Sequence, residues 1–135
     1  MGPLVQLTEP IVRMIKHPDT NKVLATASPD GRPHMIVCGS LDVSESGKIV
    51  VGEAYMYRTV KNLETNPEVE FLVWKGNSAY SIKARAVSRE TSGPEFDRMS
   101  RFLDRMNMAT VAVWEFEALE VWDESASSTS GDRVI

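Results

Sequence analysis

The sequence has one cysteine, two histidines and no long hydrophobic run, and each shortage excludes a class of structure. A single thiol, Cys38, excludes a disulfide within the chain. With His17 and His34 it gives too few ligands for a structural zinc site, so we expect no metal. No apolar run approaches the roughly 18 residues of a membrane span, and the N-terminus shows no secretory signal. We therefore expect a cytoplasmic protein with no membrane partner.

Positive charge is also scarce, since 15 Lys and Arg residues face 19 Asp and Glu residues for a net charge of -4. A chain with this balance has no overall field that attracts nucleic acid, so we expect no nucleic-acid partner. The sequence also lacks the glycine-rich phosphate loops of the common nucleotide-binding folds and the Gly-x-Ser-x-Gly motif of hydrolases. The function of its basic residues must therefore be sought locally.

What is present is an ordinary globular composition, with 42% hydrophobic residues in 135. That length fits one domain with a sizeable core. We expect a single domain over 1–124. The segment 125–135 is rich in serine, and we expect it to form a flexible C-terminal tail.

Short β-rich segments separated by turns dominate the chain. Ser28-Pro29-Asp30-Gly31 is a strong turn signal, because proline presets φ and glycine accepts a positive φ. A capping box, Ser92-Gly93-Pro94-Glu95, predicts a helix that runs to about Met108. Periodicity predicts two further helices, over 9–16 and 59–65, and strands over 22–27, 33–41, 48–52, 69–74, 79–89 and 110–121. Few helices among hairpin-linked strands indicate an antiparallel β-barrel with peripheral helices.

The segment from Tyr57 to Leu63 is the strongest candidate for chemistry. It leaves a predicted buried strand and enters a short helix, whose first amides are unpaired and carry the positive end of the helix dipole. Arg58 can donate two hydrogen bonds to one phosphate, and the Thr59 hydroxyl can add a third. The alternative is an ordinary helix start with a solvated arginine. For Cys38, in a predicted inner strand, a core role is favoured over a catalytic thiol.

Four short sequence blocks over about 22–121 carry, by their order and spacing, a resemblance to a known family. They are Ser28–His34, Lys48–Val51, Arg58–Leu63 continued by Asn66–Val69, and Gly93–Phe96. Together they resemble the FMN-binding split-barrel family, which includes pyridoxamine phosphate oxidase and flavin reductases, and in particular its small bacterial FMN-binding proteins.

The resemblance implies an antiparallel, Greek-key-like split barrel that forms a homodimer with two FMN sites at the subunit interface. It places the FMN phosphate on Arg58 and Thr59, with Lys61 as a further cation. It places the isoalloxazine ring along two strands, at Val37, Cys38, Gly39 and Ser40 and at Gly52, Glu53, Ala54 and Tyr55.

Two departures from the family pattern shape the functional expectation. Many members have lysine where this chain has Thr59, and the residues that bind pyridoxal phosphate in the oxidase find no match, which argues against vitamin synthesis. We expect an FMN-dependent oxidoreductase or electron-transfer protein. Its redox partner is either a small molecule or a protein, and the sequence does not distinguish the two. The alternatives are a non-catalytic flavin carrier and a binder of haem or a deazaflavin.

Overall fold

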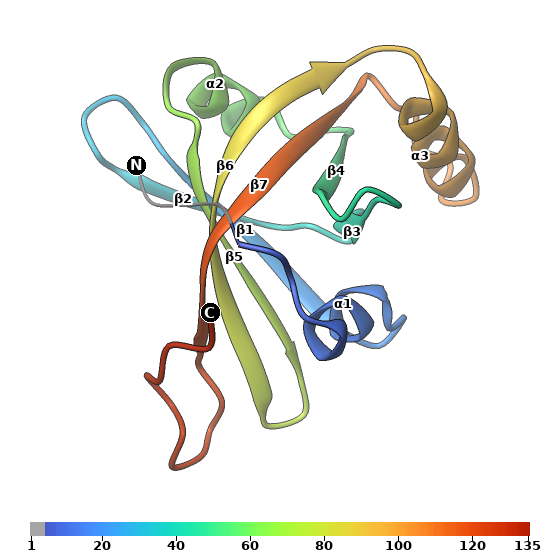
Figure 1. The fold of residues 1–135 in the computed structure, drawn as a ribbon. Coiled ribbons are helices and arrows are strands. Elements are labelled where there is room, and N and C mark those ends of the chain that lie inside the picture. Colours follow the sequence, from blue (N-terminus) through green and yellow to red (C-terminus); the bar gives the residue numbers. More distant parts are fainter. Residues whose placement is uncertain (1–4) are drawn as a thin grey trace.

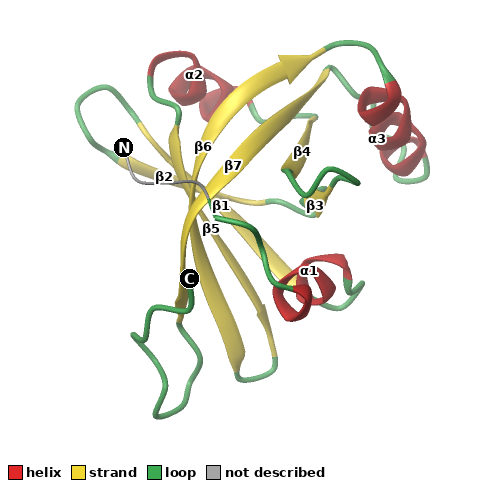
Figure 2. Cartoon of the chain, viewed as in Figure 1, coloured by secondary structure: helices red, strands yellow, loops and turns green. Residues whose placement is uncertain are grey.

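The computed structural model describes residues 5–135. In chain order its elements are α1 (Glu9–Lys16), β1 (Asn21–Ala27), β2 (Pro33–Val37), β3 (Asp42–Val43), β4 (Ile49–Glu53), α2 (Tyr57–Thr65), β5 (Glu68–Lys75), β6 (Ser78–Glu90), α3 (Pro94–Asp104) and β7 (Ala112–Asp123). The strands form one curled sheet, and the helices lie at its periphery (Figures 1 and 2).

The sheet order is β2-β1-β5-β6-β7-β4-β3, and each neighbouring pair of strands is antiparallel. Tight turns join β1 to β2 and β5 to β6, the first of them at the predicted Pro-Asp-Gly signal. Beyond β2, the Ser40 hydroxyl accepts a hydrogen bond from the Gly52 amide of β4 at 3.0 Å. This contact brings the two outer parts of the curled sheet together, and the fold is the predicted split barrel.

The core lies inside the curl of the sheet. Phe71 of β5 and Phe116 of β7 are fully buried and meet edge to face, with ring centroids 5.1 Å apart. Ile11 and Ile15, spaced four apart on α1, are also fully buried and join the same cluster. The apolar stripe of α1 thus packs against the barrel, as its periodicity predicted.

Two predicted ends of elements and one predicted helix cap were wrong. The strand predicted over 33–41 ends at Val37, because the Leu41 amide bonds to the Cys38 carbonyl in a turn. The third helix ends at Asp104, and the capping box is not formed, since Gly93 is the N-cap and Glu95 pairs with Arg98.

The pairing of β6 is interrupted at Val87. The pairing of β6 with β7 shifts register between Ala86 and Ser88, a β-bulge that leaves Val87 unpaired and exposed. A bulge inserts one residue into a strand and moves the following side chains to the opposite face.

The C-terminal segment folds back along the end of β7. The Val134 amide bonds to the Val121 carbonyl, and Trp122 and Arg133 form an isolated β-bridge. The flexibility of the segment over 125–135 stays a prediction.

Candidate functional site

Helix α2 begins with an uncapped N-terminus. It starts at Tyr57, two residues before the predicted start, so Arg58 and Thr59 lie inside its first turn. Met56, at the N-cap, offers no side-chain cap, and the first turn holds no acidic residue. Since the first amides of a helix have no partner within it, this end carries a partial positive charge that favours an anion.

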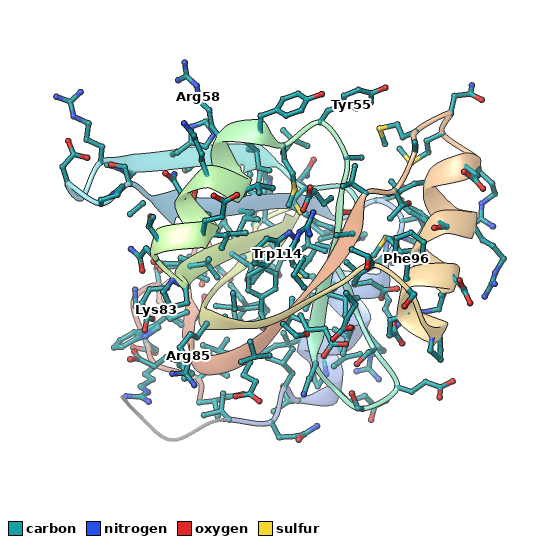
Figure 3. All side chains as sticks on the ribbon, turned by 90° about the horizontal axis from the view of Figure 1, so that it is seen from above. Tyr55, Arg58, Lys83, Arg85, Phe96 and Trp114 are labelled. Atoms are coloured by element: carbon teal, nitrogen blue, oxygen red, sulfur yellow. The ribbon has the colours of Figure 1, made fainter. Side chains whose placement is uncertain are left out.

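Four basic side chains gather beside this turn. A shallow cavity of about 380 Å³ lies between α2 and the β1–β2 turn, and its lining includes Arg32, His34, Arg58 and Lys61, which we call the hairpin cluster. Asn62 donates to the Thr26 hydroxyl at 3.0 Å and so fastens α2 onto β1. Figure 3 shows Arg58 reaching outward from the α2 end of the molecule.

The acidic complement of the hairpin cluster is small. Asp30 is the one carboxylate in the cavity lining, and it lies 3.6 Å from Arg32 in an exposed ion pair. Such pairs contribute little and leave the cation available to another anion. An excess of positive charge therefore faces this cavity.

Thr59 occupies a different position from the one expected. Its side chain is fully buried, and its Oγ1 has no hydrogen-bond partner among the described residues. A buried hydroxyl without a partner is costly and uncommon. The accessible charge beside this turn comes instead from Arg32, Arg58 and Lys61.

The four ring-contact candidates at the end of β2 and directly after it divide into exposed and buried positions. Val37 is 85% exposed, and Gly39 has open space where a side chain would stand. Cys38 is buried, and burial raises the pKa of its thiol to about 12, so the thiolate is absent at neutral pH. The Ser40 hydroxyl bonds Gly52, which leaves Val37 and Gly39 as the open positions.

The candidates at the end of β4 also differ from one another. A Cβ on Gly52 would lie 2.7 Å from Met99 Cγ and 2.9 Å from Leu103 Cδ1, so the close approach that this glycine permits is that of α3. Ala54 is half-buried, whereas Tyr55 is 71% exposed and has a left-handed φ of 57°. Strained backbone of this kind often marks a functional position.

Glu53 is held by two side chains from other strands. Its carboxylate accepts hydrogen bonds from Arg89 at 2.9 and 3.2 Å and from the Trp114 indole at 2.8 Å. Burial by itself would raise the pKa of Glu53, but these hydrogen bonds outweigh it and hold the pKa below its ordinary 4.5. The carboxylate is therefore ionised at neutral pH and anchors the end of β4.

We expect Glu53→Gln to lower the free energy of unfolding by about 1.5–3 kcal/mol at pH 7, because it removes a charged acceptor. When folding lowers the pKa of a carboxyl, its ionised form stabilises the folded state. This stabilisation is complete at a pH above the pKa of the unfolded chain and is lost as the pH falls through the pKa of the folded protein. Urea unfolding should therefore show wild type and variant converging as the pH falls below the ordinary carboxyl pKa of 4.5. The exposed Glu68→Gln is the control, and a gap that stays constant with pH would contradict the assignment.

Sequence reasoning missed Arg32 and His34 as partners of Arg58, and it missed Arg89 and Trp114 as partners of Glu53. For the first pair the signal was the turn itself, since a Pro-Asp-Gly turn sets the next residues at the rim of the barrel. The β1–β2 register, with Thr26 opposite His34, then brings that rim under α2. For Glu53 the partners lie 36 and 61 residues away, with no local signal.

Two absences concern the described residues 5–135. No helix there is long and apolar enough to cross a membrane. No group of three or more His, Cys, Asp or Glu side chains in that part of the chain could hold a metal ion.

Comparisons with known proteins found a matching family model and solved structures of similar fold. The family model described as pyridoxamine 5'-phosphate oxidase matches residues 7–125. No curated protein matches the sequence. Among solved structures, an FMN-binding protein from Syntrophomonas wolfei subsp. wolfei is similar at 17% identity and a TM-score of 0.75, over 86% of this chain and 84% of that one.

Two further structures share the fold. The haem storage protein HutZ from Vibrio cholerae is 16% identical with a TM-score of 0.66, over 90% of this chain and 97% of that one. An F420 reductase is 13% identical with a TM-score of 0.65, over 85% of this chain and 98% of that one. These proteins carry names that point to three different cofactors, so the fold by itself does not select among them.

Proposed function

Since the chain belongs to the pyridoxamine 5'-phosphate oxidase family, we propose that it is a flavoprotein that binds FMN between two copies of itself. The observation that carries the proposal is the hairpin cluster beside the uncapped N-terminus of α2. A phosphate monoester carries nearly two negative charges at neutral pH, and charged donors together with free helix amides are the groups that recognise it.

The residues present fit FMN in a specific way. Arg58 and Lys61 would hold the phosphate, and Arg32 would add positive charge in place of the lysine that Thr59 replaces. The ring would lie against the open positions Val37 and Gly39 on one side and near Tyr55 on the other, as the family resemblance implies. Bound FMN supplies transfer of a hydride or of single electrons.

The second copy is part of the proposal because the monomer exposes large apolar side chains near the same site. Five of them are 53–85% exposed: Met35, Val37, Tyr55, Tyr57 and Val111. Exposed apolar groups at this density are typical of an interaction surface. A two-fold dimer would cover them and shield a flavin ring from water.

The proposal extends to an oxidoreductase or electron-transfer role in the cytoplasm, with its electron donor still to be identified. An absorbance spectrum of the purified protein separates oxidised flavin from haem and from a deazaflavin. Turnover of NADH or NADPH above the rate with free FMN would establish a catalyst. Flavin binding without turnover would favour the carrier alternative.

Arg58→Ala is expected to weaken FMN binding about ten- to a hundredfold, because a charge-assisted hydrogen bond contributes about 1.5–3 kcal/mol. Quenching of FMN fluorescence on titration with the apoprotein measures the effect. Arg13→Ala is the matched control, since Arg13 is exposed on α1 and pairs only with Glu9 among the described residues. Equal affinities for wild type and Arg58→Ala would remove Arg58 from the site, and a protein that ignores added FMN would overturn the proposed function.

A further inference from the structure

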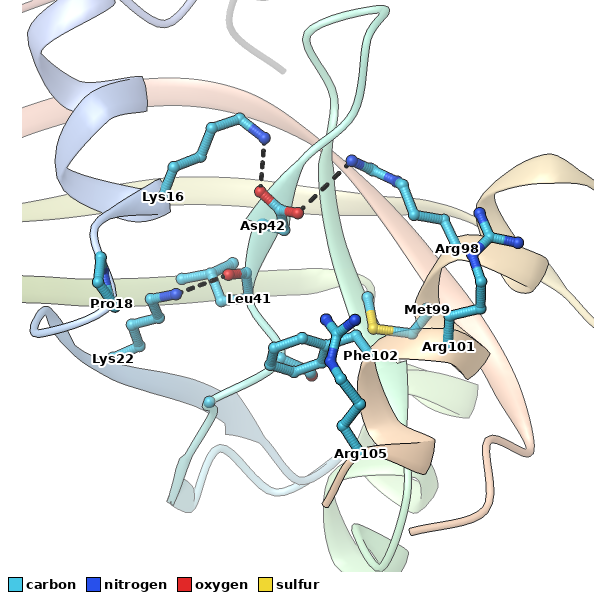
Figure 4. A pocket seen from close by; sticks show the side chains of 12 residues that line it. Lys16, Pro18, Lys22, Leu41, Asp42, Arg98, Met99, Arg101, Phe102 and Arg105 are labelled. Atoms are coloured by element: carbon cyan, nitrogen blue, oxygen red, sulfur yellow. Dashed lines mark hydrogen bonds and ion pairs between the residues drawn. The ribbon is translucent and has the colours of Figure 1, made fainter. Parts of the chain in front are cut away.

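A second basic cavity lies away from the hairpin cluster. It has a volume of about 590 Å³ and lies between α1, the β2–β3 connection and α3, and we call it the basic groove (Figure 4). Its charged lining consists of Lys16, Lys22, Asp42, Arg98, Arg101 and Arg105. It shares no lining residue with the cavity of the hairpin cluster.

One wall of the basic groove is a stripe of arginines on α3. Arg98 and Arg101 lie on α3, and Arg105 is its C-cap residue with helical backbone angles, so their spacing of three and four residues sets them on one face. The opposite wall carries Lys16 at the end of α1 and Lys22 on β1, as Figure 4 shows. Cations from separate elements therefore converge on one space.

The single carboxylate in the lining, that of Asp42, already pairs with two of the cations. Asp42 lies 2.8 Å from Lys16 Nζ and 3.6 Å from Arg98 Nη1. Arg98 also pairs with Glu95 at 2.6 Å. Asp42 therefore neutralises charge near Lys16 and Arg98 and leaves the other cations of the groove without a carboxylate.

Three cations of the basic groove have no carboxylate partner within 4.0 Å among the described residues. Lys22 Nζ donates only to the Leu41 carbonyl, at 3.0 Å, and burial lowers the pKa of this half-buried lysine. Arg101 and Arg105 form no ion pair in the described part of the chain. Arg105 instead lies over the ring of Phe102, 5.8 Å from its centroid.

This concentration of charge is unusual for the molecule. Five of the 15 Lys and Arg side chains line one groove in a chain whose net charge is -4. Like charges gathered around a concave, partly desolvated space repel one another and concentrate anions there. The volume falls in the range of small-molecule sites, roughly 300–1,000 Å³.

We propose that the basic groove is a second binding site, for a small molecule with at least two negative charges, such as a phosphorylated or polycarboxylate metabolite. One anionic group pairs with Arg101 and Arg105, and another reaches Lys22 on the opposite wall. Phe102 gives the ligand an apolar surface beside its charges. The site shares no lining residue with the hairpin cluster, and it meets the proposed flavin site at Gly39.

The test is calorimetric titration of the purified full chain with inorganic pyrophosphate at constant ionic strength. The double variant Arg101→Gln/Arg105→Gln is expected to bind at least about tenfold more weakly than wild type. Arg13→Gln/Lys75→Gln removes the same two charges from exposed positions outside the groove and should keep wild-type affinity. Circular dichroism verifies that both double variants are folded.

Pyrophosphate could also bind at the hairpin cluster, so the titration is repeated with Arg58→Ala. Pyrophosphate binding that persists in Arg58→Ala and is lost on adding Arg101→Gln/Arg105→Gln supports the groove. No binding by wild type, complete loss in Arg58→Ala alone, or an equal loss in the charge-matched control would each overturn it. FMN affinity should be the same in wild type and Arg101→Gln/Arg105→Gln, and a loss there would show that the groove is not a separate site.

Discussion

Phe71→Ala is expected to lower the free energy of unfolding by about 3–5 kcal/mol, the cost of deleting a fully buried aromatic ring. Phe71 lies opposite Leu24 of β1 and Ile82 of β6 in the sheet, and its ring meets Phe116 of β7. Its removal therefore opens a cavity where four strands pack on one another. Chemical denaturation measures the loss.

The matched control is Phe102→Ala, since Phe102 is 36% exposed and its ring has no part in the main core. We expect that change to cost less than about 1 kcal/mol. Equal losses at the two positions would contradict the assignment of Phe71 to the centre of the barrel.

The second large effect is expected for Val37→Glu, which tests the proposed dimer. Val37 is 85% exposed on the monomer, on the open face of β2 near the proposed flavin ring. A glutamate buried there without a partner should weaken dimerisation at least about a hundredfold, with a parallel loss of FMN affinity. Light scattering should show the mass falling from twice 15.0 kDa to 15.0 kDa.

Val134→Glu makes the same substitution at a 43%-exposed valine near the C-terminus and should leave both properties unchanged. A wild-type protein that is monomeric with FMN bound would refute the shared site. A Val37→Glu protein that still dimerises and binds FMN as wild type does would show that β2 is outside the interface.

Much of the barrel was predictable because its signals are local. The turn at 28–31, the alternation of β5 and the apolar stripe of α1 each depend on neighbours a few residues apart. Boundaries were less predictable. The strand that begins at Pro33 ends at Val37 rather than at Leu41, since the Leu41 amide bonds back to the Cys38 carbonyl in a turn.

The candidate site was predictable in part. Arg58 and Lys61 are three apart on α2, and both line the hairpin cluster beside the turn. The burial of Thr59 was not readable, because the side on which a helix packs depends on where it docks on the sheet. The need for glycine at position 52 is likewise visible only in the folded structure, where Met99 and Leu103 fill the space that a side chain would occupy.

The sequence by itself determined the antiparallel barrel, its helices at the periphery and an arginine at the start of α2, since periodicity and turn chemistry act over a few residues. Tertiary structure alone decided which charges meet. Glu53 finds Arg89 and Trp114, and the arginine stripe of α3 faces Lys22, because sheet closure joins segments that are distant in the chain. Electrostatic interaction depends on distance in space, and only the folded chain sets that distance.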